Sequence, residues 1–164
     1  MIISENYKIS EVELIYRNKV KAKDRPRIQR SCDAYELLCQ SWDMNKMDLQ
    51  EQFKVLLLDK GGHCMGIMLV SSGGMSACLV DPKLVFATAL KARACSLILA
   101  HNHPSGNLKA SKEDEALTEQ LCEGGGLLHI DILDHLILTS DGYTSLADDG
   151  NACLSRKKSY ALTR

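Results

Sequence analysis

The sequence lacks any long apolar run, and this absence limits where the protein can act. No run approaches the roughly 20 apolar residues that a transmembrane helix needs. The first residues, Met1 to Asn6, also lack the basic start and apolar core of a signal peptide. We therefore expect a cytoplasmic protein with no membrane partner.

Paired cysteine motifs are absent as well. The seven cysteines form no CxxC motif, and an odd number does not suit a closed disulfide framework. They are scattered at positions 32, 39, 64, 78, 95, 122 and 153. We expect reduced thiols, most of them buried.

The chain has no excess of positive charge. Its net charge of -1 predicts no general attraction to nucleic acid, because such binding needs many cations that displace counterions from phosphates. One basic run is the exception and contains Lys19, Lys21, Lys23, Arg25, Arg27 and Arg30. We favour a solvated strand edge or arm for this run, with a nucleic-acid contact as the alternative.

Repeats, low-complexity segments and a phosphate-binding loop are also missing. The pair Gly73-Gly74 is not followed by the Lys-Ser or Lys-Thr of such a loop. A length of 164 residues, with 45% hydrophobic and 25% charged residues, suits one globular domain with a single core.

Hydrophobic spacing and turn residues predict strands mixed with helices, which indicates an α/β or α+β domain with a sheet flanked by helices. We expect strands at residues 12–16, 53–58, 63–70, 78–80, 96–100, 127–132 and 133–138. We expect helices at residues 31–42, capped by Ser31, at residues 82–93, capped by Asp81, and from Ser111 to the glycines at 124–126.

A candidate metal site follows the apolar strand at residues 96–100. His101 and His103 are two residues apart on an extended segment, so their side chains point to the same side and can reach one ion. Helical spacing places Asp114 on the core-facing stripe of the next helix, where it can supply a third ligand. Two imidazoles and one carboxylate leave one position of a tetrahedral Zn²⁺ open, as in catalytic sites.

Two further residues complete the chemistry of a hydrolase. Because Asp114 would be occupied by the metal, another carboxylate must accept the proton of the attacking water, and Glu51 is our candidate. The hydroxyl of Ser111 could stabilise a developing oxyanion in addition to capping the helix. His63 and His129 have no nearby partners in the sequence, whereas His135 follows Asp134, which could orient its imidazole.

These motifs resemble a known family. The motif His101-x-His103-Pro104 is followed by Ser111, with seven residues between His103 and Ser111, and then by Asp114 after two more residues. This pattern is similar to the JAMM motif of JAB/MPN metallopeptidase domains. The stretch from Ala100 to Gly106, together with Leu133-Asp134-His135, resembles the RadC family of bacterial proteins more closely. The resemblance covers roughly residues 47–150.

The resemblance implies an MPN-type fold with a mixed sheet, Zn²⁺ held by His101, His103 and Asp114, Glu51 as the catalytic glutamate and Ser111 as the motif serine. Ala110 departs from the family, which often has proline there. Residues 1–46 do not contain the helix-hairpin-helix-like segment of longer RadC-like proteins. We expect them to form a strand, the basic run and a helix packed on the domain at 47–150, with a tail at 151–164.

Three functions are compatible with this sequence. The first, which we prefer, is a zinc-dependent hydrolase that cleaves a peptide or isopeptide amide bond in an unknown protein or peptide substrate. The second is a metal-dependent nuclease or phosphodiesterase associated with DNA, as the family's link to DNA repair suggests. The third is a non-catalytic interaction module that uses its metal structurally.

Overall fold

The computed structural model describes residues 20–73 and 79–155, in which one mixed sheet of five strands is flanked by helices. This arrangement confirms the predicted α+β fold class. The strands are β1 Gln52–Leu58, β2 Cys64–Ser72, β3 Ser96–Asn102, β4 Asp131–Thr139 and β5 Gly142–Ser145. The helices are the 3-10 helix η1 Ala22–Asp24 and the α-helices α1 Ser31–Ser41, α2 Met44–Met47, α3 Pro82–Ala92, α4 Lys112–Leu128 and α5 Ala152–Ser155.

The strands follow the order β2-β1-β3-β4-β5 across the sheet. Strand β1 pairs antiparallel with both β2 and β3, whereas β3 and β4 are parallel and are connected through α4. All seven residues of β1 and of β3 are buried, because both strands are central and covered on both faces. The end of β3 and the start of α4 therefore belong to the same crossover connection.

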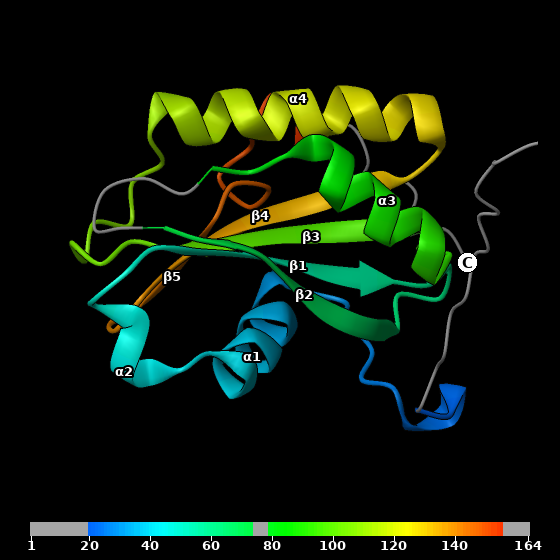
Figure 1. The fold of residues 1–164 in the computed structure, drawn as a ribbon, viewed down its shortest axis with the longest axis horizontal. Coiled ribbons are helices and arrows are strands. Elements are labelled where there is room, and N and C mark those ends of the chain that lie inside the picture. Colours follow the sequence, from blue (N-terminus) through cyan, green and yellow to red (C-terminus); the bar gives the residue numbers. More distant parts are fainter. Residues whose placement is uncertain (1–19, 74–78, 156–164) are drawn as a thin grey trace, which may run out of the picture.

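Helices cover both faces of the sheet (Figure 1). Helices α3 and α4 lie on one face, and α1 lies on the other. Alternation along the strands divides the core accordingly: Leu99 belongs to the cluster that includes Leu121 of α4, whereas Ile98 belongs to the cluster that includes Leu38 of α1. His101 continues the Leu99 side of β3, so it faces α4.

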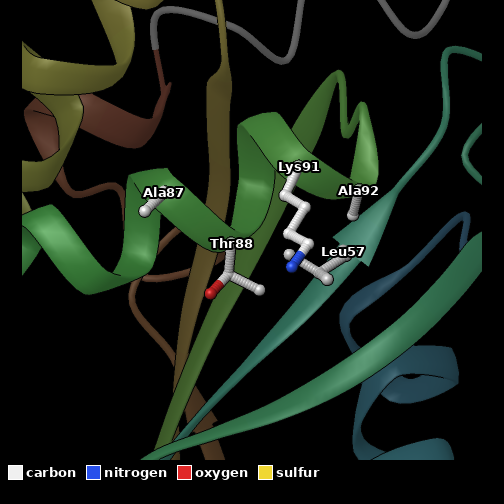
Figure 2. A pocket seen from close by; sticks show the side chains of 5 residues that line it. All are labelled: Leu57, Ala87, Thr88, Lys91 and Ala92. Atoms are coloured by element: carbon white, nitrogen blue, oxygen red, sulfur yellow. The ribbon is translucent and has the colours of Figure 1, made fainter. Parts of the chain in front are cut away.

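An apolar pocket of about 270 Å³ lies between α3 and β1. Figure 2 shows the side chains that line it: Leu57, Ala87, Thr88, Lys91 and Ala92. Leu57 pairs with Leu97, which precedes His101 by four residues and so lies about 13 Å away from it along β3. The pocket is therefore separate from the histidine cluster.

Helix α4 is longer than the sequence predicted. The glycines at 124–126 do not end it, and residues 127 and 128, which were expected in a strand, form its last turn. Close packing explains the glycines: a Cβ on Gly124 would lie 2.8 Å from the Phe86 ring, and one on Gly125 would lie 2.3 Å from the carbonyl oxygen of Ile130. The helix ends instead at His129, whose φ of 54° is left-handed.

Other predicted boundaries also need correction. Arg30, not Ser31, is the N-cap of α1, because the carboxylate of Asp33 accepts from the backbone N–H of Arg30 at 2.9 Å. Residues 79 and 80 are not in a strand, and the segment at residues 43–48, for which no element was predicted, contains the short helix α2. The tail after Asn151 begins with α5.

Some of the predicted features lie outside the described residues: the strand expected at 12–16, Lys19, Cys78 and residues 156–164. The two strands predicted at 127–132 and 133–138 are a single strand, β4, and β5 was not predicted. Strands β1, β2 and β3 and helix α3, with Asp81 as its N-cap, agree with their predicted positions within a few residues. Among the described helices, none combines the length and the apolar character needed to cross a membrane.

Candidate metal centre

The C-terminal end of β3 and the first turn of α4 place three side chains together. His101 lies in β3, His103 follows the strand, and Asp114 is the third residue of α4. His101 Nε2 is 3.1 Å from Asp114 Oδ1, His103 Nε2 is 3.5 Å from Asp114 Oδ2, and the two Nε2 atoms are 2.9 Å apart. The sequence-predicted ligand set therefore forms a single cluster that could hold a metal ion.

The separations suit a small divalent cation. One potential ligand atom from each of the three residues lies within 4.8 Å of the others. With zinc bonds of about 2.0–2.2 Å, ligand atoms of a tetrahedral site are about 3.3–3.5 Å apart. The cluster needs only adjustments of a few tenths of an ångström to match this spacing.

The protonation of His103 provides a test of the fit to a cation. Its Nδ1 lies 2.6 Å from the carbonyl oxygen of Asn107, and since a carbonyl can only accept, Nδ1 carries the proton. A neutral His103 then directs the electron pair of Nε2 toward the carboxylate of Asp114, which is repulsive unless a cation or a proton lies between them. Nitrogen and oxygen ligands of this kind suit zinc.

The electrostatics of the cluster favour a positive charge at the same point. Although burial alone would raise the pKa of Asp114, its contacts with the imidazoles of His101 and His103 hold that pKa far below its ordinary value. The hydrogen bond to Asp114 in turn raises the pKa of His103 above its ordinary value, against its partial burial. The carboxylate is therefore anionic and attracts either protons on the imidazoles or a metal ion.

Ser111 and Asp114 form the predicted capping box. The Ser111 hydroxyl accepts from the backbone N–H of Asp114 at 3.1 Å, and Asp114 Oδ2 accepts from the backbone N–H of Ser111 at 2.7 Å. Because the hydroxyl acts as an acceptor in the cap, its own proton remains free to be donated. Capping therefore does not preclude a second role for Ser111.

Strand pairing brings Glu51 to the cluster from a distant part of the sequence. Phe53 pairs with His101, and the backbone N–H of Gln52 donates to Asn102 Oδ1 at 2.8 Å, so continuation of the register places Glu51 across from His103. Phe53 and His101 stack on the same face of the sheet, with ring centroids 6.1 Å apart. The charge of Glu51 also contributes to the raised pKa of His103.

Asn102 holds the segment that carries Glu51, a role that the sequence did not indicate. Its fully buried amide donates to the carbonyl oxygens of Met47 and Gln50 at 2.7 and 3.0 Å, in addition to accepting from Gln52. These three bonds fix the backbone on both sides of Glu51. The available signal was an amide side chain directly after the apolar run at residues 97–100 and His101.

His135 contacts the cluster through His101, and Asp134 does not orient its imidazole. Its Nε2 is 2.8 Å from Nδ1 of His101, and burial lowers the pKa of His135 well below its ordinary value. The expectation that Asp134 orients the imidazole is wrong, because its carboxylate instead accepts from the backbone N–H groups of His135 and Ala147 and from the hydroxyl of Ser145. Burial raises the pKa of Asp134.

The other two histidines lie away from the cluster. His63 Nδ1 is 3.2 Å from Asp59 Oδ1 in the hairpin between β1 and β2. His129 ends α4 at the opposite end of that helix from Asp114. Both histidines therefore belong to places where the chain turns, and neither faces the cluster.

The basic run is divided between paired and exposed side chains. Arg25 lies 3.6 Å from Asp59, and Arg30 lies 3.1 Å from Asp33. The backbone of Arg27 forms an isolated antiparallel bridge with that of His63, and Lys21, Lys23 and Arg27 are all exposed. Part of the run thus lies along the β1–β2 hairpin.

A hollow of about 500 Å³ lies next to the segment that connects the ligands. Leu108 and Ala110, between His103 and Ser111 in the sequence, form one wall, and Thr144 and Leu146 contribute to the other. The hollow therefore lies beside the connection between β3 and α4, and none of the three clustered residues lines it.

Comparison with known proteins identifies the same region of the chain. The model of a family described as the RadC-like JAB domain matches residues 28–151. A UPF0758 protein of Methanosarcina mazei is 41% identical over 124 residues, covering 76% of this chain and 53% of that protein. Another, from Methanococcoides burtonii, is 37% identical over 139 residues, covering 84% of this chain and 59% of the relative. The chain spans about half the length of the curated relatives it matches.

Proposed function

Because this chain belongs to the RadC-like JAB domain family, we propose that it is a zinc-dependent hydrolase of a peptide or isopeptide amide bond. The observation that carries the proposal is the cluster of His101, His103 and Asp114, whose ligand atoms converge without a fourth protein ligand among the described residues. A set of three ligands is typical of catalytic zinc.

Each residue of the proposed site has a separate role in amide hydrolysis. His101, His103 and Asp114 would hold the ion, which when bound supplies the Lewis acidity that activates water and polarises a carbonyl. Glu51, which directly precedes β1 and lies across from His103 by continuation of the register, accepts a proton as general base and returns it to the leaving amine. The Ser111 hydroxyl, whose proton is not used in the helix cap, donates to the developing oxyanion.

The nuclease alternative has less support. Many phosphoryl-transfer sites use two metal ions and several carboxylates, whereas the possible ligand set among the described residues has one carboxylate, that of Asp114, with Glu51 beside it as the proposed base. Two arginines of the basic run are already paired with aspartates. The exposed Lys21, Lys23 and Arg27 are the cations that a nucleic-acid partner would contact.

The first test is metal content combined with peptide cleavage. We expect the purified protein to bind about one equivalent of zinc and, when loaded, to cleave peptides in a complex mixture, with new termini detected by mass spectrometry. Glu51→Gln should retain zinc but lower the rate at least 100-fold, because the general base is lost. Supercoiled plasmid assayed in parallel tests the nuclease alternative.

Failure to bind zinc on reconstitution would exclude the proposal. Plasmid cleavage that depends on zinc, without cleavage of any peptide, would replace it with the nuclease. As a matched control, Glu119→Gln changes an exposed carboxylate of α4, five residues after Asp114, and should leave the peptide cleavage rate and the zinc content unchanged.

A further inference from the structure

A network of buried polar side chains lies behind His101. It consists of His101, His135 of β4 and Thr118 of α4, whose exposed fractions are 1%, 0% and 0%. His101 Nδ1 is 2.8 Å from His135 Nε2, and His135 Nδ1 is 2.6 Å from Thr118 Oγ1. The Thr118 hydroxyl is also 2.6 Å from the backbone carbonyl oxygen of Asp114.

The directions of these hydrogen bonds follow from the carbonyl at one end. A carbonyl oxygen can only accept, so the single hydroxyl proton of Thr118 is donated to Asp114. The hydroxyl oxygen must then accept from the other side, which requires a proton on Nδ1 of His135. A charge on a fully buried imidazole is disfavoured, so His135 is neutral and its Nε2 is an acceptor.

The same reasoning extends to the ligand. Since His135 Nε2 accepts, His101 donates to it from Nδ1, which leaves the electron pair on Nε2. That atom faces Asp114 at 3.1 Å and His103 at 2.9 Å. The network therefore connects the backbone carbonyl of one proposed ligand, Asp114, to the imidazole of another, His101, and determines the tautomer of that imidazole.

We propose that Thr118 and His135 are positioning residues that hold His101 in the tautomer and orientation needed to bind zinc through Nε2. The proposal rests on the proposed function and extends it to two residues that are neither ligands nor the base. Hydrogen bonds to the second nitrogen of a metal-binding imidazole typically change metal affinity about 10–100-fold. The backbone bond to Asp114 also couples β3, α4 and β4 at the site.

Zinc affinity of Thr118 variants tests the network. Thr118→Val preserves the shape of the side chain but removes the hydroxyl, so His135 loses the acceptor for its Nδ1 proton. In competition with a chromophoric zinc chelator, we expect about 10–100-fold weaker binding for Thr118→Val. Thr118→Ser, which restores the hydroxyl, should bind within a few-fold of the unchanged protein. Thr88→Val, on α3 beside the separate pocket, is a matched control that should not change affinity.

Nitrogen NMR of the imidazoles tests the same proposal without zinc. In the metal-free protein we expect His135 to carry its proton on Nδ1, and in Thr118→Val we expect population of the Nε2–H form. Amide spectra verify that each variant is folded, and the spectrum of the unchanged protein decides the question even if the valine variant does not fold.

The outcomes separate this proposal from the proposed function. A proton on Nε2 of His135 in the unchanged protein, or unaltered zinc affinity in a folded Thr118→Val, would overturn the network while leaving the zinc site intact. If the unchanged protein bound no zinc, the proposed function would fail, whereas the His135 spectrum would still support or overturn the predicted tautomer.

Discussion

At the scale of single residues, successive side chains at the end of β3 point to opposite faces of the sheet. His101 and His103 point toward α4, while Asn102 between them contacts the segment that leads into β1. A shift of this short stretch by one residue would exchange the two sets of side chains between the faces. The ligands and the support of the proposed base are therefore fixed by the same register.

Replacing Asn102 should separate hydrolysis from metal binding. Asn102→Ala removes three hydrogen bonds to the backbone around Glu51, and we expect slower peptide cleavage with nearly unchanged zinc affinity. We also expect a loss of about 1–3 kcal/mol in the free energy of unfolding from the buried groups left unpaired. Cleavage assays, chelator competition and urea denaturation measure the three quantities.

A double variant distinguishes positioning from general destabilisation. If Asn102 acts through Glu51, Asn102→Ala should reduce cleavage little further when Glu51→Gln is already present. Independent, additive losses would contradict that role. Normal cleavage by Asn102→Ala at full zinc occupancy would contradict it as well.

Residue spacing was sufficient to predict the ligand cluster, but not its surroundings. His101, His103 and Asp114 could be grouped because strand alternation and the first helical turn are local rules. The contacts of Asn102 with the segment before β1, and of Thr118 with His135, join residues far apart in the sequence. Spacing along the sequence does not predict such contacts, because they depend on how the strands pair in the sheet.

At the scale of elements, α4 shows how packing overrides helix propensity. Its three consecutive glycines resemble a helix stop in the sequence, and each is unfavourable in a helix interior by about 1 kcal/mol relative to alanine. They nevertheless lie within the helix, because Gly124 approaches Phe86 of α3 and Gly125 approaches the backbone of Ile130. The sequence predicted where α4 starts, through its cap, but not where it ends.

Neighbouring glycines of α4 should respond oppositely to alanine. A Cβ at Gly125 would lie 2.3 Å from the carbonyl oxygen of Ile130, so Gly125→Ala should destabilise the protein by about 1–3 kcal/mol. Gly126 is exposed, and a Cβ there would meet no atom within 4 Å, so Gly126→Ala should stabilise the protein by up to about 1 kcal/mol. Urea denaturation measures both changes, and equal effects would contradict the packing explanation.

At the scale of the whole molecule, the fold has a core that does not depend on the metal cluster. Buried hydrophobic residues form one cluster under α3 and α4 and another under α1, on opposite faces of the sheet. The proposed ligands lie at the end of the sheet, beyond most of both clusters. This placement is typical of a site carried by a fold and not of a metal that holds a fold together.

Removal of zinc should therefore lower stability without unfolding the protein. Zinc at 100 times its Kd adds about 2.7 kcal/mol to the free energy of unfolding, and a strong chelator should remove this increment. Thermal unfolding followed by circular dichroism, with and without chelator, measures the change. A chain that unfolds at room temperature on chelation would instead favour the non-catalytic module with a structural metal.

The register of β1 against β3 has a consequence for the order in which the site forms during folding. His103 and Asp114 are close in sequence, whereas Glu51 must be brought across about fifty residues to reach His103. Closing the longer loop costs about 1.4 kcal/mol more in chain entropy. We expect the ligand cluster to close first and Glu51 to join it last, so a folding chain would gain the ability to hold an ion before the ability to hydrolyse a bond.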